Sequence, residues 1–442
     1  MTTPNTQISL PISNSPVRGA HLQWTVDFGS QGLTFYVVEP VDYAPGSHAT
    51  LFGQLVSASL APPGRGGGTE DARGGLIRFD LMTFPEAFLS AEDFLTTLDY
   101  LAQQRASPIF HVGLRATTGD HLFTVAQLRE LIEAVRARQG PESADLQALS
   151  DWTAAQLSTE LFNVAALFLI DADGDLRVCL HPKNVPSPIE ASVLPGNTVT
   201  GADFLCAVTL KPKNALYRRV VVQPLICSDL LDLRTPRGGP GPMEALCTEA
   251  DRLGSDAPDH IDVISVVTCT PQDDLRRSTD MPIDLMWKPK FLKAFADAYT
   301  RAQFNRHDTA VFVMSNFRRG PEQSDGSRPD HGLAGCCVPV PPTPISPAES
   351  LVWGHGRHGA SGQDLWERMD RKSETFQPLR LLLAIDPSMP ITPVVARLMR
   401  FTMPIMPRFQ PRQTPSGPTD VLVSNWPAAD GSITLNPEVR NV

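Results

Sequence analysis

Residues 221–230 read VVQPLICSDL, an apolar run that ends in a cysteine and is followed at once by Ser-Asp. An apolar run of this length is typical of a strand buried within a sheet. Cys227 would then stand at the carboxyl end of the strand, the edge where α/β folds place their chemistry. An inert core thiol is the simpler explanation for a cysteine in this position. The remaining sequence has to distinguish packing from catalysis.

The composition is that of a globular protein. The chain has 442 residues, of which 42% are hydrophobic and 19% charged, enough for one large decorated domain or two domains. A net charge of −10 argues against a partner bound through phosphate contacts, so nucleic acid is not expected. We expect no membrane span and no secretory signal. The odd number of cysteines, seven, favours a reducing cytoplasm over a disulfide-stapled secreted fold.

Apolar and amphipathic stretches alternate along the chain, which predicts an α/β fold. Residues 171–175, DADGD, predict a tight turn between paired strands. The chain divides into an N-terminal arm (1–20), a main domain (21–390) and a proline-rich C-terminal tail (391–442). Predicted strands cover 33–41, 49–60, 76–84, 108–116, 162–180, 218–227, 260–270, 309–316 and 378–387, with a long loop before 218. Predicted helices cover 91–105, two stretches within 121–160, 243–253 and 288–306.

A catalytic cysteine needs a base within reach and donors for an oxyanion, because a free thiol is mostly protonated at neutral pH. The ten histidines show no setting of the thiol-protease kind. Glu86 follows an apolar strand and a proline, which suits a carboxylate at a pocket rim. Lys183 and Glu190 are seven residues apart and add an ammonium and a second carboxylate to a coupled cluster. Lys211 and Lys213 are rival candidates for the lysine.

The three segments that carry these residues resemble, in this order, the signature blocks of the nitrilase superfamily of carbon–nitrogen hydrolases. They are TFPEAFLS (83–90), HPKNVPSPIEASVLPG (181–196) and PLICSDLL (224–231). YTRAQFNRHDTAVFVMSN (299–316), GLAGCCVPVPP (332–342) and LRLLLAID (379–386) are similar to later blocks. The resemblance spans about residues 45–390. Phe304-Asn305 replaces the usual Glu-Asn, and residues 117–160 and 196–217 are additional, which indicates a divergent member.

The resemblance implies an α/β fold of the nitrilase type, a four-layer α-β-β-α sandwich with inserted helices and an extended C-terminal tail. It implies one site per subunit and pairing into a homodimer or a higher even oligomer. It also implies catalysis with no metal or organic cofactor. The site residues that it implies are Glu86 as general base, Cys227 as nucleophile, Lys183 and the N–H of Ser228 as oxyanion donors, Glu190 near the hydrolytic water, and Asp229 as support for the turn after the nucleophile.

The function implied is a thiol-dependent hydrolase that cleaves a small-molecule amide or nitrile through a cysteine thioester. One alternative is a catalytically weak binding or regulatory module with a protein partner in a multi-protein bacterial system, such as phage defence. Another is an acyltransferase that uses the same thioester. The pair Cys336-Cys337 fits a core better than a metal site, since no ligand stands at zinc spacing. His355 and His358 lie in a predicted loop, with a place at the pocket mouth as the minority interpretation.

Overall fold

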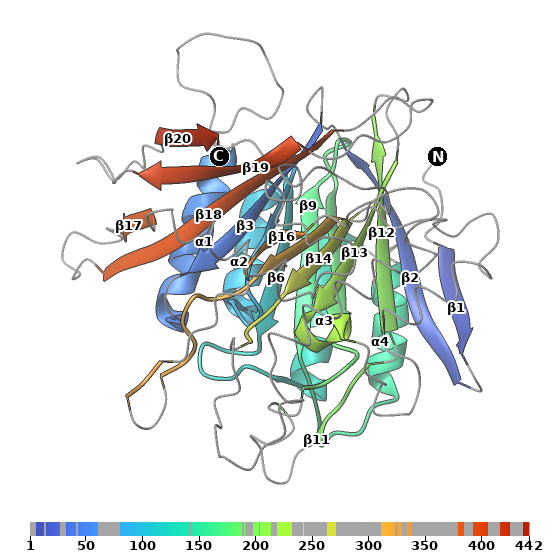
Figure 1. Ribbon diagram of the computed structural model, residues 1–442. Helices are drawn as coiled ribbons and strands as arrows, with labels where there is room; N and C mark the ends of the chain where they lie inside the picture. The colour runs from blue at the N-terminus through green and yellow to red at the C-terminus, as the bar shows by residue number, and fades with distance from the viewer. Residues whose placement is uncertain are drawn as a thin grey trace, which may run out of the picture.

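The computed structural model shows an α/β protein in which two mixed β-sheets and four α-helices form the described part (Figure 1). The structure describes residues 6–12, 15–26, 32–40, 43–60, 80–140, 144–187, 190, 198–202, 204–213, 219–231, 242, 263–270, 311–322, 326–328, 334–337, 379–383, 392–404, 416–424 and 436–441. No helix in these ranges is long and apolar enough to cross a membrane.

The first sheet has seven strands and contains the run that opened the sequence analysis. All seven residues of β13 (Val220–Ile226) are buried, as the apolar sequence predicts. β13 runs parallel to β14 and antiparallel to β12. The strand order is β1 (Thr6–Ile12), β2 (Ser15–Val26), β12 (Phe204–Pro212), β13, β14 (Val263–Val267), β15 (Val311–Ser315) and β16 (Gly335–Cys337).

The second sheet has ten strands. β9 and β10 form the predicted hairpin, with Ile170 opposite Leu176, and Asp171 accepts the N–H groups of Asp173 and Asp175 inside the turn. The order is β10 (Leu176–Pro182), β9 (Val164–Ile170), β6 (Ile109–Arg115), β4 (Leu81–Thr83), β3 (Gly32–Pro40), β18 (Thr392–Pro404), β19 (Ser416–Ser424) and β20 (Asn436–Asn441), with β17 (Leu379–Leu383) on β18 and β5 (Leu89–Ser90) on β6. A small third sheet joins β11 (Thr198–Val199), β8 (Glu160–Phe162) and β7 (Phe123–Thr124).

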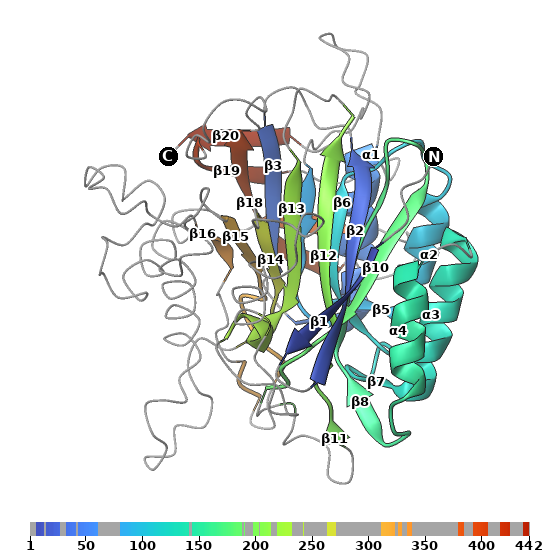
Figure 2. The same ribbon diagram turned by 90° about the vertical axis from the view of Figure 1, so that its right-hand side faces the viewer.

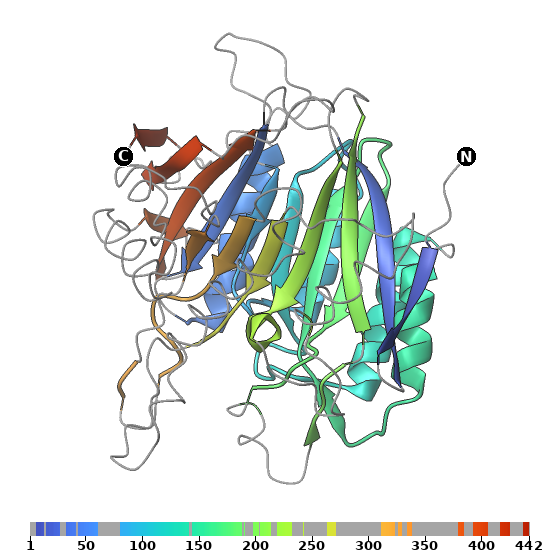
Figure 3. The ribbon, with the colours of Figure 1, turned by 45° about the vertical axis from the view of Figure 1, so that its right-hand side comes forward.

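The two large sheets pack face to face, and the helices cover the outer face of the second sheet (Figures 2 and 3). Polar contacts bridge the sheets, since Ser265 of β14 bonds Thr83 of β4 at 2.8 Å and His111 of β6 at 2.7 Å. The described residues therefore form three layers, helix on sheet on sheet. The helices predicted at 243–253 and 288–306, which would make the fourth layer, lie outside the described residues.

The helices follow from their apolar spacing and their caps. α2 (Ala91–Leu101) buries Phe94, Leu98 and Leu101, and α3 (Val125–Gln139) begins with a capping box between Thr124 and Gln127. α4 (Ala144–Ala154) follows, so the predicted helices in 91–160 are confirmed.

One predicted strand is wrong. Residues 49–60 lie in the helix α1 (Pro45–Leu60), which has proline at its first position. Leu51, Phe52, Leu55 and Val56 are its buried apolar residues, and their spacing of one and four is helical rather than alternating.

Three further segments differ from the prediction. The long loop expected before residue 218 contains β12, whose residues 204–212 pair in parallel with β2 along their whole length. β1 and β2 lie within residues 6–26, where an irregular arm was expected for residues 1–20. β18 lies in the expected tail and pairs with all of β3. Its prolines, Pro393 and Pro404, stand near the strand ends, where a missing N–H is tolerated.

Candidate active site

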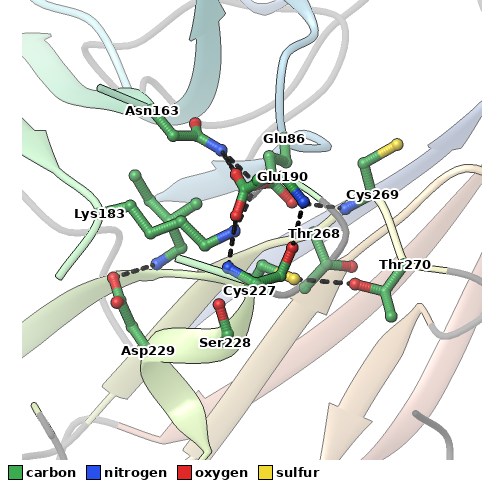
Figure 4. Close-up of polar contacts among 12 residues, drawn as sticks. Glu86, Asn163, Lys183, Glu190, Cys227, Ser228, Asp229, Thr268, Cys269 and Thr270 are labelled. Carbon is green, nitrogen blue, oxygen red and sulfur yellow. Dashed lines mark hydrogen bonds and ion pairs between the residues drawn. The ribbon is translucent and has the colours of Figure 1, made fainter. Parts of the chain in front are cut away.

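Three sequence-predicted residues meet at one edge of the paired sheets. Cys227 follows β13, Glu86 follows β4 and Lys183 follows β10, each directly after or shortly beyond the carboxyl end of its strand. Figure 4 shows their side chains turned toward a common centre. All three residues are at most 4% exposed. The fold therefore brings a thiol, a carboxylate and an ammonium together inside the protein, although they are far apart in the sequence.

Cys227 occupies a sharp turn between β13 and the 3-10 helix η1 (Cys227–Leu230). Its φ of 47° lies in the left-handed region, which costs a non-glycine residue about 1–3 kcal/mol and is often found at functional sites. Sγ lies 2.8 Å from the Oγ1 of Thr270, which follows β14.

Glu86 is held by its backbone as well as by its carboxylate. Its N–H donates to the carbonyl of Thr268 at 3.1 Å, and its Oε2 accepts the N–H of Cys269 at 2.9 Å. The loop lies against β6 so closely that a Cβ at Gly113 would come within 2.4 Å of the Glu86 Cα. Ala87 follows with a φ of 50°. These backbone hydrogen bonds and the close packing on Gly113 fix the direction in which the Glu86 carboxylate points.

Lys183 sits between two carboxylates. Its Nζ donates to Glu86 Oε1 at 2.9 Å and to Glu190 Oε2 at 2.8 Å. An ammonium has three protons, and these two bonds account for two of them. Among the described residues no third acceptor of Nζ is found. The third proton can therefore be offered to a substrate oxygen or nitrogen.

Asn163, between β8 and β9, links the carboxylates of Glu86 and Glu190 through its side-chain amide. Its Nδ2 donates to Glu86 Oε1 at 2.5 Å and to Glu190 Oε1 at 2.6 Å, and it lies 3.3 Å from Nε2 of His121. Glu190 Oε2 also accepts the N–H of Ser187 at 2.6 Å. Glu190 thus binds Lys183 and is itself fixed from two sides, which orients the ammonium.

Asp229 and Ser228 tie the nucleophile turn to the lysine segment. Asp229 Oδ1 accepts the N–H groups of Asn184 and Val185, both at 2.8 Å, and its Oδ2 accepts the N–H of Ile226 at 3.2 Å. The hydroxyl of Ser228 donates to the carbonyl of Val185. These contacts fix the position of Lys183 relative to Cys227. They extend the predicted support role of Asp229 from the turn to the lysine segment.

The charges of the site set its resting protonation state. Burial, followed by the charge of Glu86, raises the pKa of Cys227, while Lys183 and the hydrogen bond from Thr270 oppose the rise. The resting thiol is therefore protonated and needs a base. Burial opposes the charge of Lys183, but the Cys227 thiolate, once formed, and the two glutamates outweigh it and hold the pKa of Lys183 well above the usual value. Burial would raise the pKa of Glu190, yet Lys183 and His121 bring it down to about 2.

His121 and the two glutamates form a group of side chains that could hold a metal ion. One ligand atom each from Glu86, His121 and Glu190 lies within 4.8 Å of the others. The Lys183 ammonium is bonded to both carboxylates, so it already supplies a positive charge where a metal ion would bind. Burial lowers the pKa of His121, and the positive charges of Lys183 and Arg115 contribute, against the two glutamates.

The structure separates the sequence candidates clearly. Lys183 is in the site, whereas Lys213 reaches only the carbonyl of Ala172 at 3.5 Å and is exposed. Lys211 is the second-last residue of β12 and is only half-buried, whereas Lys183 is buried. Cys336 and Cys337 lie in β16, and their side chains are not described; His355 and His358 lie outside the described residues.

Sequence reasoning missed Asn163, His121 and Thr270. A lone asparagine inside the apolar run LFNVAALF was an available signal for Asn163. His121 and Thr270 stand in segments that carry no local signal.

No protein-family model matches the chain, and no curated protein sequence matches it. Solved structures similar to it are amidases and a carbon–nitrogen hydrolase. A mutant amidase from Nesterenkonia sp. AN1, with a covalent acetamide adduct at its active-site cysteine, is 13% identical with a TM-score of 0.33, over 70% of this chain and 84% of the amidase.

Two further structures match at a similar level. An N-terminal amidase is 9% identical with a TM-score of 0.34, over 69% of this chain and 90% of its own. A carbon–nitrogen hydrolase from Helicobacter pylori is 8% identical with a TM-score of 0.35, over 69% and 82%. Matches this distant identify neither a reaction nor a substrate, so the chemistry has to come from the side chains of the site.

Proposed function

We propose that the protein is a divergent member of the nitrilase superfamily that hydrolyses the carbon–nitrogen bond of a small amide or nitrile through a cysteine thioester. The observation that carries the proposal is the buried contact between Glu86 and Lys183, 2.9 Å, beside a cysteine in a left-handed turn. The charges of both residues act on the pKa of the Cys227 thiol. A carboxylate, an ammonium and a thiol in one enclosed place are the parts that thiol-dependent amide hydrolysis needs.

In the first half-reaction, Glu86 accepts the proton of the Cys227 thiol. The thiolate attacks the amide carbon, and the oxygen takes up the negative charge. The third Nζ–H of Lys183, which has no acceptor among the described residues, and the N–H of Ser228 stabilise this oxyanion in the buried site. Glu86 then returns its proton to the nitrogen, the amine or ammonia leaves, and a thioester to Cys227 remains.

In the second half-reaction, Glu86 takes a proton from water and the hydroxide equivalent attacks the thioester carbonyl. The carbon–sulfur bond breaks, the acid leaves, and the thiolate recovers the proton from Glu86. Glu190 orients the Lys183 ammonium through their contact and lies near the hydrolytic water. With a nitrile, the same attack gives a thioimidate, whose nitrogen leaves as ammonia after water adds.

The proposal extends to the four-layer α-β-β-α architecture and to a homodimer or higher even oligomer. Support for the architecture comes from the three layers already described and from the amphipathic sequence at 288–306. The oligomeric state stays a prediction, which light scattering of the full chain would test.

The test is release of ammonia or amine from a panel of short amides and nitriles. Cys227→Ala is expected to abolish release. Cys206→Ala, which removes another buried thiol from β12, is the matched control and is expected to retain it. Release that survives in Cys227→Ala, or a broad panel from which the wild type releases nothing, would replace the hydrolase with the binding-module alternative.

A further inference from the structure

A second buried cation lies near the proposed site, and the reaction above does not use it. Arg115, the last residue of β6, is 4% exposed. Its Nη2 donates to the Tyr43 hydroxyl at 2.9 Å, and the guanidinium lies over the Tyr43 ring, 5.5 Å from its centroid. Its Nε and Nη1 are buried and have no hydrogen-bond partner among the described residues.

An arginine in this state needs an anion. The guanidinium cannot release its proton to escape burial, and Nε and Nη1 together present three N–H donors. A buried charge without a partner is strongly unfavourable. Within the described ranges no carboxylate lies at ion-pair distance from Arg115. The missing partner is therefore a group that the described residues do not supply.

Strand alternation shows where the side chain of Arg115 points. His111, Gly113 and Arg115 are alternate residues of β6 and share one face of the second sheet. His111 bonds Ser265 of the first sheet, and Gly113 lies against the backbone of Glu86. That face is thus the one between the sheets. Arg115 continues it at the carboxyl end of β6, beside the Glu86 loop.

Arg115 is as buried as Cys227, but three residues near it are less buried than the catalytic cluster. Tyr43, His121 and Cys269 are each half-buried, whereas Glu86, Lys183 and Cys227 are buried. Burial, followed by Glu86 and Cys227, raises the pKa of Cys269, and Lys183 and Arg115 oppose it. The charges of the catalytic residues and of Arg115 thus both act on the pKa of the Cys269 thiol. The N–H of Cys269 donates a hydrogen bond directly to Glu86. A substrate that reaches Cys227 from this side passes the guanidinium.

We propose that Arg115 binds a carboxylate of the substrate, so that the preferred substrates are amides or nitriles that carry a carboxylate a few bonds from the scissile carbon. This inference rests on the proposed function. A carboxylate matches the planar guanidinium through two parallel hydrogen bonds. Tyr43 adds a donor, because its oxygen accepts from Arg115 and its own proton remains for the anion. Burial raises the pKa of Tyr43 to about 12, which keeps that proton in place.

Binding can be tested without turnover. Malonate, succinate and glutarate, the diacids that hydrolysis of such monoamides would release, are titrated calorimetrically into the full-length wild type, Arg115→Gln and Arg115→Lys. We expect the best of the three to bind Arg115→Gln at least about tenfold more weakly than wild type, from the loss of charge-assisted hydrogen bonds. Arg115→Lys should recover only part of the affinity. Arg136→Gln, on the outer helix α3, is the control and should bind as wild type.

Stability provides an independent readout. If no carboxylate pairs with Arg115, Arg115→Gln removes an uncompensated charge, and its melting temperature in the absence of ligand should equal or exceed that of Tyr43→Phe, which loses the same Arg115–Tyr43 hydrogen bond but keeps the charge. A melting temperature clearly below that of Tyr43→Phe would show a carboxylate partner within the protein and overturn the proposal. Equal diacid affinity in wild type and Arg115→Gln, or no diacid binding to wild type, would also overturn it. Phosphate binding lost in Arg115→Gln without diacid binding would replace the carboxylate with another anion.

Turnover separates this inference from the proposed function. Butanamide and 4-amino-4-oxobutanoate differ by the carboxylate at one end. In wild type the second should have the higher kcat/KM, and Arg115→Gln should reverse or remove the preference mainly through KM. If neither amide is hydrolysed while diacid affinity still depends on Arg115, the hydrolase proposal fails and the anion site stands. If both amides are hydrolysed equally by wild type and Arg115→Gln, the anion site fails and the hydrolase proposal stands.

Discussion

The substitution Gly113→Ala tests whether close backbone packing fixes the catalytic glutamate. A methyl group at this position would lie 2.4 Å from the Glu86 Cα and 2.5 Å from the Ala87 nitrogen. Both atoms belong to the backbone, so no side-chain rotation can relieve the contact. The loop has to move away from β6, although two hydrogen bonds hold it there: Gly113 N–H to Pro85 at 3.0 Å and Phe88 N–H to Gly113 at 2.8 Å.

The expected cost follows from overpacking. Insertion of one extra methyl into a well-packed core costs about 1–3 kcal/mol of unfolding free energy. The displaced loop also carries Glu86, whose Oε1 has to stay near the 2.9 Å contact with Lys183 for proton transfer and charge balance. A misplacement of about 1 Å in a catalytic group can reduce the rate about 100-fold. We therefore expect kcat/KM for an amide substrate to fall by about 10- to 100-fold.

The assay combines urea denaturation with ammonia release. Gly53→Ala in α1 is the matched control, because a Cβ there meets no atom within 4 Å and the residue is exposed inside a helix. It should raise the unfolding free energy by about 0.5–1 kcal/mol and leave activity unchanged. Gly113→Ala with wild-type stability and wild-type activity would refute the claim that this contact positions Glu86.

Three further substitutions probe the contacts of the site. Thr270→Val removes a hydrogen bond that lowers the pKa of Cys227, so the pH profile of iodoacetamide labelling of Cys227 should shift to higher pH. Thr270→Ser keeps the hydroxyl and should restore the wild-type profile. An unchanged profile in Thr270→Val would count against the contact. Glu190 has a folded pKa of about 2 against a usual 4.5, so its stabilisation is complete above pH 4.5 and is lost as the pH falls to about 2. Glu190→Gln should therefore be about 2–4 kcal/mol less stable than wild type at pH 7, with a gap that closes toward pH 2 in denaturant titrations; a constant gap would contradict the ion pair. Asp229→Asn should lose about 1–3 kcal/mol of unfolding free energy at pH 8, because its amide cannot accept all three backbone N–H groups, and wild-type stability would show that those bonds are dispensable.

Local periodicity was sufficient for much of the fold. The buried spacing of α2 and α3, the turn between β9 and β10, and the apolar run of β13 each predict their own structure. Segments that depend on distant partners were harder. β12 gains its place through pairing with β2, and β18 through pairing with β3, and neither partner lies nearby in sequence. The helix α1 was misassigned because an apolar stretch of this length suits a strand or a helix until its buried positions are known.

The site was predictable where it depends on strand ends and not where it depends on tertiary contacts. Glu86 and Cys227 each follow a recognisable strand, which predicts a place at the edge of a sheet. Lys183 was preferred to Lys211 and Lys213 only because its segment resembles a family block, and that resemblance implied the convergence of the three residues. Asn163 binds both glutamates from the amino end of β9, a place that the sequence does not connect with either. Thr270 reaches Cys227 only through the parallel pairing of β13 with β14, and Arg115 becomes relevant only once the sheets face each other. Three-dimensional packing, rather than local pattern, selects these residues.

The most direct measurement of the central claim is the mass of the Cys227 peptide during turnover. Wild-type protein mixed with an excess of a short amide and quenched in acid within one turnover should carry one acyl group on the peptide containing Cys227, and the adduct should disappear as the acid product forms. Cys227→Ala should carry none and release no product. An acyl group on another cysteine, or product formation with no adduct and with full activity in Cys227→Ala, would contradict the account.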